Sequence, residues 1–561
     1  MHLSNDRIPV SPSLGSVTDK DRATQHEMVN RRVFYLSIQA VINALIIGGI
    51  ARLLVLLIDL VTHIFFYGEW SLSPVSPAEN HLGWYVLLVP VAGGILVGLM
   101  ARFGSKAIRG HGIPEAMEKI ILDESRIPPA LSFLKPLSAA ISIGTGGPFG
   151  AEGPIIATGG AFGSLTGQIM HISAAERKII LAAGACAGMS AIFGTPLAAV
   201  LLAIELLLFE FSARSIIPVA LACITGAGMH ILLFGKQPVF EMPAIPVPTN
   251  GALIFYVFFG ALMGVTASWV SKSVYVIEDL FEKLPVHWMW WPAIGAVVVG
   301  VVGYFAPSTM GVGYDNIRHL LSGSLPLGVL FSLCILKYVS WSISLGSGTS
   351  GGTLAPLFTI GGALGALSGT LAIQWLPALG LNVATMALVG MAAMFAGASR
   401  ALLTSIVFAL ETTGQQHGLL PLMGACAAAY FVSFFLMRGS IMTEKIKRRG
   451  VRTPESYQPD ILKTAAVEQL LEPMPGNPGE LLHVYDTDDL GFAAELMGRC
   501  NQDRLLVVGH EDSSQVRGVI TSASILAYYS RQKQKEHKYQ SPATTRRMMV
   551  QARRWLNRLR E

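Results

Sequence analysis

The chain has 561 residues, of which 52% are hydrophobic and only 14% charged, and its mean hydropathy is +0.51. Soluble domains carry about 25% charged residues, so this composition excludes a protein whose surface lies mostly in water. The net charge of +5 and five scattered cysteines give no sign of a nucleic-acid partner, a disulfide framework or a metal cluster. We expect no metal and no bound cofactor.

Charged residues are concentrated at the two ends of the chain. Residues 33–443 consist of apolar segments broken by Gly and Pro, and about 20 apolar residues suffice to cross a bilayer core. The sequence therefore predicts an all-α polytopic membrane domain there. The other expected parts are an N-terminal segment at 1–32, a linker at 444–460, a small α/β domain at 461–531 and a basic amphipathic tail at 532–561.

Basic residues flank the apolar part of the chain. Arg31 and Arg32 precede the first apolar segment, and Lys445, Lys447 and Arg448 follow the last. By the positive-inside rule both termini should be cytoplasmic, in a plasma (inner) membrane. A merely solvated basic run is the alternative interpretation.

The two halves of the apolar part repeat one another. Glycines and prolines around Gly150–Pro154 recur around Gly352–Pro356 at a constant spacing. The matching polar pairs are Lys135 with Lys337 and Glu205 with Glu411. Interrupted helices at corresponding positions of two halves are typical of transport sites. The sequence therefore predicts an internal duplication.

Three Gly-rich elements have the chemistry of an anion site. Gly150–Pro154 and Gly352–Pro356 each open a helix with proline in the first turn, and Gly110–Glu115 has the same design. A helix N-terminus offers free N–H groups and about half a positive charge. Several such termini facing one point would bind a dehydrated anion without holding it too tightly to conduct.

Two lysines lie within apolar segments. A charge inside a membrane is a functional candidate by default, so Lys135 and Lys337 are expected to act electrostatically on the pore. Snorkelling of each lysine to an interface is an equally weighted alternative.

These elements resemble motifs of the CLC family of chloride channels and proton-coupled chloride exchangers. Gly110–Glu115 is similar to the GSGIPE element of that family, Gly150–Pro154 to its GREGP element and Gly352–Pro356 to its GxFxP element. The resemblance covers roughly residues 33–443. It implies about eighteen helices in two halves of inverted topology, and a homodimer with one pore per subunit.

The resemblance also implies the residues of the site. Glu152 would be the gating glutamate, whose carboxylate competes with anions; a plain N-terminal capping acid is the alternative. The implied anion-binding residues are His111, Gly112, Ile113, Gly153, Leu354, Ala355 and Met442.

The chain departs from the family pattern at the central site. His111 stands where the family has a serine, and Met442 where it has the pore tyrosine. Ala151 replaces an arginine and Leu354 a phenylalanine. Backbone N–H groups should then dominate, so that the site admits chloride but also polyatomic anions such as nitrate or bicarbonate.

A further departure concerns protons. Leu206 occupies the position of the internal proton glutamate of many exchangers. Leucine carries no proton, which favours passive, channel-like conduction. Some exchangers also lack this glutamate, so proton-coupled exchange remains an alternative, with Glu205 as the nearest candidate for a proton pathway.

The C-terminal region resembles one CBS repeat. The expected elements are strands at 505–508 and 518–521 and a helix at 490–497, capped by Asp488 or Asp489. Ser524 stands where nucleotide-binding members have a ribose-contacting aspartate. We therefore expect dimerisation or regulation there and no adenine nucleotide. The basic tail either lies on an anionic leaflet or docks as a solvated helix.

Two other classes of protein compete with a transporter. Residues 348–352 match GxSxG, the nucleophile pattern of serine hydrolases, but the duplication explains these glycines independently. An HExxH metal motif is absent from the sequence. We expect no enzyme; a membrane sensor with the C-terminal domain as output is the third possibility.

Overall fold

The structure is a computed structural model that describes residues 19–448, 462, 465–473, 482–509 and 515–540. It divides into two compact units, one formed by residues 31–455 and the other by residues 1–30 with 456–561.

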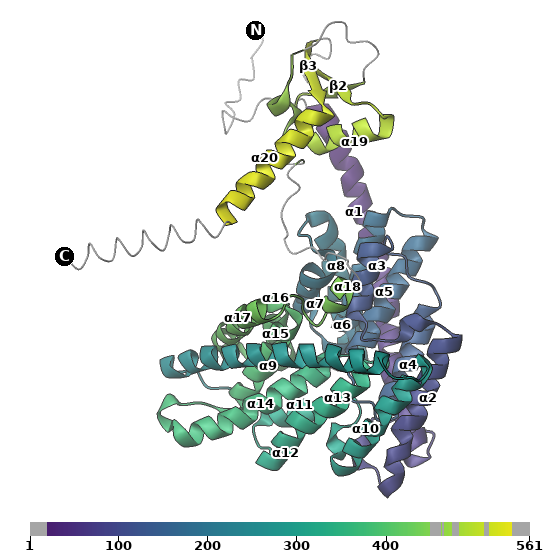
Figure 1. The fold of residues 1–561 in the computed structure, drawn as a ribbon, viewed down its shortest axis with the longest axis vertical. Coiled ribbons are helices and arrows are strands. Elements are labelled where there is room, and N and C mark those ends of the chain that lie inside the picture. The colour runs from purple at the N-terminus through teal and green to yellow at the C-terminus, as the bar shows by residue number, and fades with distance from the viewer. Residues whose placement is uncertain (1–18, 449–461, 463–464, 474–481, 510–514, 541–561) are drawn as a thin grey trace, which may run out of the picture. The chain divides into compact units, whose positions relative to one another are not determined.

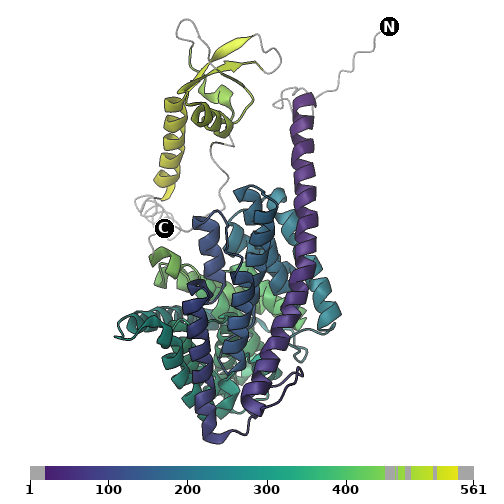
Figure 2. The ribbon, with the colours of Figure 1, turned by 90° about the vertical axis from the view of Figure 1, so that its right-hand side faces the viewer.

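The unit of residues 31–455 is built of helices joined by loops in its described part, and its helices cross at varied tilts (Figures 1 and 2). Among the described residues, eight stretches are long and apolar enough to cross a membrane. They are Arg31–Tyr67, Gly83–Phe103, Ala213–Leu233, Asn250–Glu282, Trp288–Phe305, Leu327–Gly346, Leu354–Trp375 and Gln416–Leu436. Shorter apolar helices lie between these stretches.

The duplicated sequence has a duplicated structure. Seven helices of the first half each have a counterpart in the second. The pairs are α2 (Leu88–Phe103) and α10 (Trp291–Phe305), α3 (Ile113–Leu122) and α11 (Tyr314–Ser322), α4 (Leu131–Gly144) and α13 (Lys337–Gly346), α5 (Glu152–Ile169) and α14 (Leu354–Trp375), α6 (Ala174–Phe193) and α15 (Val383–Ser399), α7 (Pro196–Leu202) and α16 (Leu402–Thr413), and α8 (Ala213–Leu233) and α17 (Leu419–Leu436). The remaining helices of this part are α1 (Asp19–Thr62), α9 (Asn250–Glu282), α12 (Leu327–Phe331) and α18 (Glu444–Arg448).

Packing follows the same duplication. Helix α5 packs on α6 as α14 packs on α15, and α6 contacts α8 as α15 contacts α17. Small residues permit this: a Cβ on Gly159 would overlap the carbonyl oxygen of Gly184, and a Cβ on Gly361 would lie 2.5 Å from that of Gly390. Close backbone approach through small residues is how membrane helices associate without a hydrophobic driving force.

Helical structure extends past both expected ends of the membrane domain. Helix α1 begins at Asp19, within the expected N-terminal segment. Residues 444–448, which we assigned to the linker, form α18, and Ile446 is buried with 1% exposure. One apolar side chain among four charges gives little pattern in the sequence, and only the tertiary contact shows that this turn belongs to the domain. The rest of the linker lies outside the described residues.

The second unit contains an α/β fold. Parallel strands β1 (His483–Tyr485) and β2 (Arg504–Val508) are joined through α19 (Leu490–Cys500), and β3 (Val516–Thr521) pairs antiparallel with β2. Helix α20 (Ser522–Gln540) follows.

The predicted helix and two strands of this unit are present, and β1 is an additional strand that the sequence analysis did not contain. The Asp489 carboxylate caps α19 by accepting from the Phe492 N–H at 2.8 Å. The Ser524 hydroxyl donates to the Thr521 carbonyl at 2.8 Å, in the first turn of α20. The expected tail helix beyond residue 540 lies outside the described residues.

Candidate functional site

The three Gly-rich elements meet through their backbones. The Gly352 N–H donates to the Gly150 carbonyl at 3.0 Å, which joins the two repeats. The Gly110 N–H donates to the Thr349 carbonyl at 3.3 Å, and the Gly351 N–H to the Gly110 carbonyl at 3.4 Å. Loops far apart in the sequence are thereby held at one place.

Glycine is required for this approach. A Cβ on Gly153 would lie 2.8 Å from the Cα of Gly352 and would overlap the carbonyl oxygen of His111. Helices α3, α5 and α14 begin at Ile113, Glu152 and Leu354 respectively, directly beside these contacts. The N-terminal ends of three helices therefore converge. Two of these helices belong to the first repeat and one to the second.

Glu152 occupies the point of convergence. Its side chain is fully buried, and Oε1 accepts from the Ala355 N–H at 2.5 Å. Oε2 accepts from the Tyr314 hydroxyl at 3.2 Å, and the N–H of Leu354 also faces the carboxylate. A carboxylate thus lies at the N-terminus of α14, where the helix dipole and free N–H groups favour negative charge.

The two lysines support the loops that lead into the site. The Lys135 ammonium donates to the carbonyls of Ile108 and Gly110 at 2.8 and 2.9 Å. The Lys337 ammonium donates to the Gly311 carbonyl at 3.2 Å and to the carbonyl two residues earlier at 2.8 Å. Both side chains are buried, so neither ammonium snorkels to an interface. Each fixes a loop and leaves one positive charge in the interior.

The structure adds an element that the sequence analysis missed. Gly311–Gly313 precedes α11 as Gly110–Gly112 precedes α3, and the two glycines of each loop have positive φ, at 66° and 77° in one and 101° and 93° in the other. The Gly-x-Gly spacing, which recurs at an offset of 201 residues (311 − 110 and 313 − 112), was the available signal in the sequence. It brings Tyr314 to Glu152.

The expected central residues are all buried. His111 is 6% exposed, and its Nδ1 has no hydrogen-bond partner within the described part of the chain. The Gly112 N–H donates to the Glu115 carboxylate at 2.5 Å, so that donor is already engaged. The Met442 side chain is fully buried, and its N–H donates to the Ser440 hydroxyl at 3.2 Å.

Glu205 has a structural partner of its own. Within the π-helical turn after α7, its carboxylate accepts from the N–H groups of Leu403 and Thr404 at 2.9 Å each, and so caps α16. Its counterpart Glu411 caps α7 in the same way, at 3.0 and 2.8 Å. The two matching glutamates thus tie the two halves together reciprocally.

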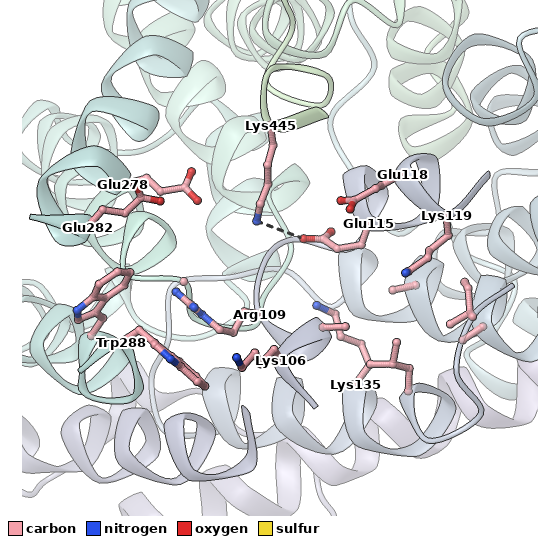
Figure 3. A pocket seen from close by; sticks show the side chains of 18 residues that line it. Lys106, Arg109, Glu115, Glu118, Lys119, Lys135, Glu278, Glu282, Trp288 and Lys445 are labelled. Atoms are coloured by element: carbon pink, nitrogen blue, oxygen red, sulfur yellow. Dashed lines mark ion pairs between the residues drawn. The ribbon is translucent and has the colours of Figure 1, made fainter. Parts of the chain in front are cut away.

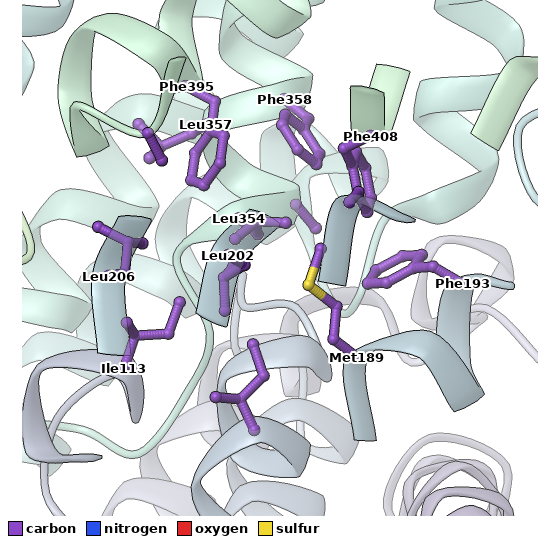
Figure 4. Packing of buried hydrophobic residues seen from close by; sticks show 14 of the residues in the cluster. Ile113, Met189, Phe193, Leu202, Leu206, Leu354, Leu357, Phe358, Phe395 and Phe408 are labelled. Carbon is purple, nitrogen blue, oxygen red and sulfur yellow. The ribbon is translucent and has the colours of Figure 1, made fainter. Parts of the chain in front are cut away.

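Leu206 lies in a large buried apolar cluster. It is 3% exposed, and the cluster also contains Ile113, Leu202 and Leu354 (Figure 4). The side chain at this position therefore contributes an apolar wall and no titratable group.

One cavity, here called the Lys445 cavity, has a volume of about 500 Å³ and reaches Glu115 of the first motif and Arg109 directly before that motif (Figure 3). Its charged lining residues are Lys106, Arg109, Lys119, Lys135 and Lys445 with Glu115, Glu118, Glu278 and Glu282. The Arg109 guanidinium stacks on Trp288 and Trp291, 5.2 and 5.4 Å from the ring centroids. These contacts hold a cation at the cavity wall.

A second cavity, here called the Tyr314 cavity, has a volume of about 480 Å³. Its wall includes Ala151, which precedes Glu152 in the chain, and Tyr314, which donates to the Glu152 carboxylate. The lining residues of the two cavities have no member in common. Each cavity thus approaches the motif loops separately.

The geometry disfavours the hydrolase alternative. Ser350 is fully buried, and its hydroxyl accepts from the Ser138 hydroxyl at 3.2 Å. Among the described residues, no histidine or carboxylate forms a hydrogen bond with it. A serine nucleophile needs such a base within reach.

Together, the fold and the site define a polytopic integral membrane protein in which two repeats bring helix N-termini around a buried carboxylate. Comparison with known proteins agrees with this class. The model of the family "Voltage gated chloride channel" matches residues 92–434. The chain belongs to this voltage-gated chloride channel (CLC) family, whose members are anion transporters and not enzymes.

Some relatives in the family are named as chloride channels and others as proton/chloride exchangers. The chain is 26% identical to a "Putative chloride channel protein ClcB-like" of Ralstonia nicotianae, over 69% of this chain and 91% of the relative. It is 28% identical to an "H(+)/Cl(-) exchange transporter ClcA" of Yersinia pestis, over 79% and 94%. The solved structure of a slow cyanobacterial Cl-/H+ antiporter is similar in fold, with a TM-score of 0.65 at 22% identity over 73% of this chain and 97% of that one.

Proposed function

We propose that this chain carries chloride and other small inorganic anions across the membrane through a pathway in each subunit, gated by Glu152. The observation that carries the proposal is the Glu152 carboxylate bound by the Ala355 N–H at the start of α14. A carboxylate held by these donors is in the place of an anion. Protonation would remove its charge, weaken these hydrogen bonds and open the position to a transported ion.

The proposed pathway runs from the Lys445 cavity past the central residues to the Tyr314 cavity. Fixed cations such as Lys135 would concentrate anions in the first cavity by their potential. The central position would use the backbone of Ile113 and Gly153, together with His111 and Met442. The outer position would use the N–H groups of α14, from Leu354 and Ala355.

We propose channel-like conduction with weak or absent proton coupling. Leu206 lies within an apolar cluster, and the Glu205 carboxylate is engaged in capping α16. Neither side chain is therefore placed to carry protons in addition to Glu152. Proton-coupled exchange is the alternative.

The first prediction tests both points in liposomes that contain the purified protein. A chloride gradient should drive anion efflux, and should not drive protons uphill, because the pathway offers one titratable gate and no internal relay. Efflux and internal pH are recorded together. Robust uphill proton movement would establish the exchanger, and absence of any anion flux would refute transport altogether.

The second prediction concerns selectivity and rests on His111, whose buried Nδ1 has no partner among the described residues. An imidazole nitrogen can accept from the O–H of bicarbonate or donate to nitrate. In His111→Ser the preference for chloride over these anions should rise about tenfold, since a hydrogen bond to a charged group is worth roughly 1.5 kcal/mol or more. Bi-ionic flux measurements would give the ratios.

His230→Ser is the matched control, because His230 is equally buried but bonds to the Ala191 carbonyl in α6. It should leave the anion ranking unchanged. If His111→Ser and the wild type rank the anions identically with chloride first, His111 does not set selectivity.

Assembly and orientation are also proposals. As the family resemblance implies, we propose a homodimer with one pore per subunit; a solution mass near that of a single 60.0 kDa chain would contradict it. The basic residues around Arg32 and Lys445 support cytoplasmic termini in the plasma (inner) membrane. The C-terminal unit would then be a cytoplasmic, CBS-like regulatory domain.

A further inference from the structure

Tyr314 lies beside the proposed gate in a fixed orientation. Its hydroxyl is 3.2 Å from Oε2 of Glu152, and the Ala151 N–H faces the same hydroxyl oxygen. An ionised carboxylate only accepts hydrogen bonds, so the hydroxyl donates to it. The ring packs edge-on against Phe193 and Phe240, with centroids 5.7 and 5.9 Å away. These contacts hold the donor in place independently of Glu152.

The hydroxyl can also meet an ion that enters from outside the loops. Tyr314 lines the Tyr314 cavity directly. If the Glu152 carboxylate moves away, the donors it leaves include the Ala355 N–H and the Tyr314 hydroxyl. An anion in the vacated place would be bound by the same pair, because a halide and a carboxylate oxygen accept from the same kind of donor.

We infer that Tyr314 is the side-chain ligand of the outer anion position: its hydroxyl donates to Glu152 in the closed state and to the transported anion in the open state. The inference rests on the proposed role of Glu152 as gate. It gives the second repeat's Gly-x-Gly element a function. It also supplies one hydroxyl to a pathway in which His111 and Met442 replace both expected ones.

Other charged groups near this position have different partners. Lys337, from α13, is a buried cation that interacts electrostatically with Glu152, and its ammonium is bonded to the carbonyls of Thr309 and Gly311. The charged residues that line the Tyr314 cavity are Arg52, Asp59, Glu79, Asp315 and Arg318. Among the described side chains, only the Tyr314 hydroxyl forms a hydrogen bond with the Glu152 carboxylate.

The first part of the test is the pH dependence of chloride efflux from liposomes. Tyr314→Phe removes a donor to the ionised gate, so the gate should protonate and open more readily. At chloride concentrations too low to fill the outer position, the pH of half-maximal flux should rise by about one unit, the size expected for one hydrogen bond to a charge. Tyr338→Phe is the matched control, because the Tyr338 hydroxyl donates to Ser273 on α9 and should shift nothing.

The second part measures chloride binding with the gate neutralised. Calorimetric titration of purified Glu152→Gln and of the Glu152→Gln, Tyr314→Phe double variant should show about tenfold weaker chloride binding in the double variant. Equal affinity in the two proteins, or an unshifted pH of half-maximal flux in Tyr314→Phe, overturns the inference. Failure of the gate itself is recognised separately, because Glu152→Gln alone would then keep the wild-type pH dependence.

Discussion

Replacing Glu152 by glutamine is expected to make anion flux independent of pH. In the wild type, a gate that opens by binding one proton should lose about tenfold of its open fraction for each pH unit above its midpoint. Glutamine keeps the size of the side chain and can still accept from the Ala355 N–H, but it carries no charge that could compete with an anion. At every pH, flux in Glu152→Gln should therefore equal the high flux that the wild type reaches at acidic pH.

The measurement is chloride efflux from liposomes between about pH 3.5 and pH 8, a range that begins below the ordinary glutamate pKa of about 4.3. Glu79→Gln is the control, since Glu79 is exposed and also lines the Tyr314 cavity. Glu79→Gln also removes one negative charge, but from the cavity that leads to the site, and it should keep the wild-type pH profile. A pH profile unchanged in Glu152→Gln would exclude Glu152 as the gate and leave it as a capping acid of α5.

Replacing Gly352 by alanine is expected to reduce flux about a hundredfold at equal protein density. The added Cβ would lie 2.9 Å from the Gly153 nitrogen and 2.5 Å from the Gly150 carbonyl oxygen. Both neighbours are backbone atoms that cannot rotate away, so the two motif loops must separate. Misplacement by about 1 Å is known to cost such factors at preorganised sites, and the N–H groups of α14 would no longer face Glu152.

Gly362→Ala provides the matched control on the same helix. A Cβ on Gly362 would have its nearest neighbour, a Leu320 methyl carbon, at 3.5 Å, which is ordinary contact. This variant should conduct like the wild type and unfold no more easily, since alanine favours a helix over glycine by up to about 1 kcal/mol. Wild-type flux in Gly352→Ala would show that the junction of the two repeats does not shape the site.

Local patterns in the sequence were enough for the class of protein and for the position of the motifs. Apolar length and the sparse charge predict the membrane spans, because a bilayer tolerates little else. Proline and glycine at fixed places predict where α5 and α14 begin, since these residues act on their own backbone. The matching Lys135 and Lys337 predict the duplication, because two halves that fold alike keep the same residues.

Contacts between residues far apart in the chain had to come from the tertiary structure. In the sequence Glu205 is a candidate for a proton pathway, yet it caps a helix of the opposite repeat, as does its counterpart Glu411. Tyr314 reaches Glu152 only because the Gly-x-Gly loop of the second repeat lies beside the start of α5.

By itself, the sequence therefore determined that this is a duplicated CLC-type membrane protein whose helix N-termini suit an anion. Which donors meet the carboxylate of Glu152, and whether Lys135 reaches water or a buried loop, was decided only by the tertiary structure. The physical reason is the separation along the chain over which each kind of interaction acts. Propensity, hydropathy and capping act within a few residues, whereas a hydrogen bond between Glu152 and Tyr314 depends on how two separate repeats pack.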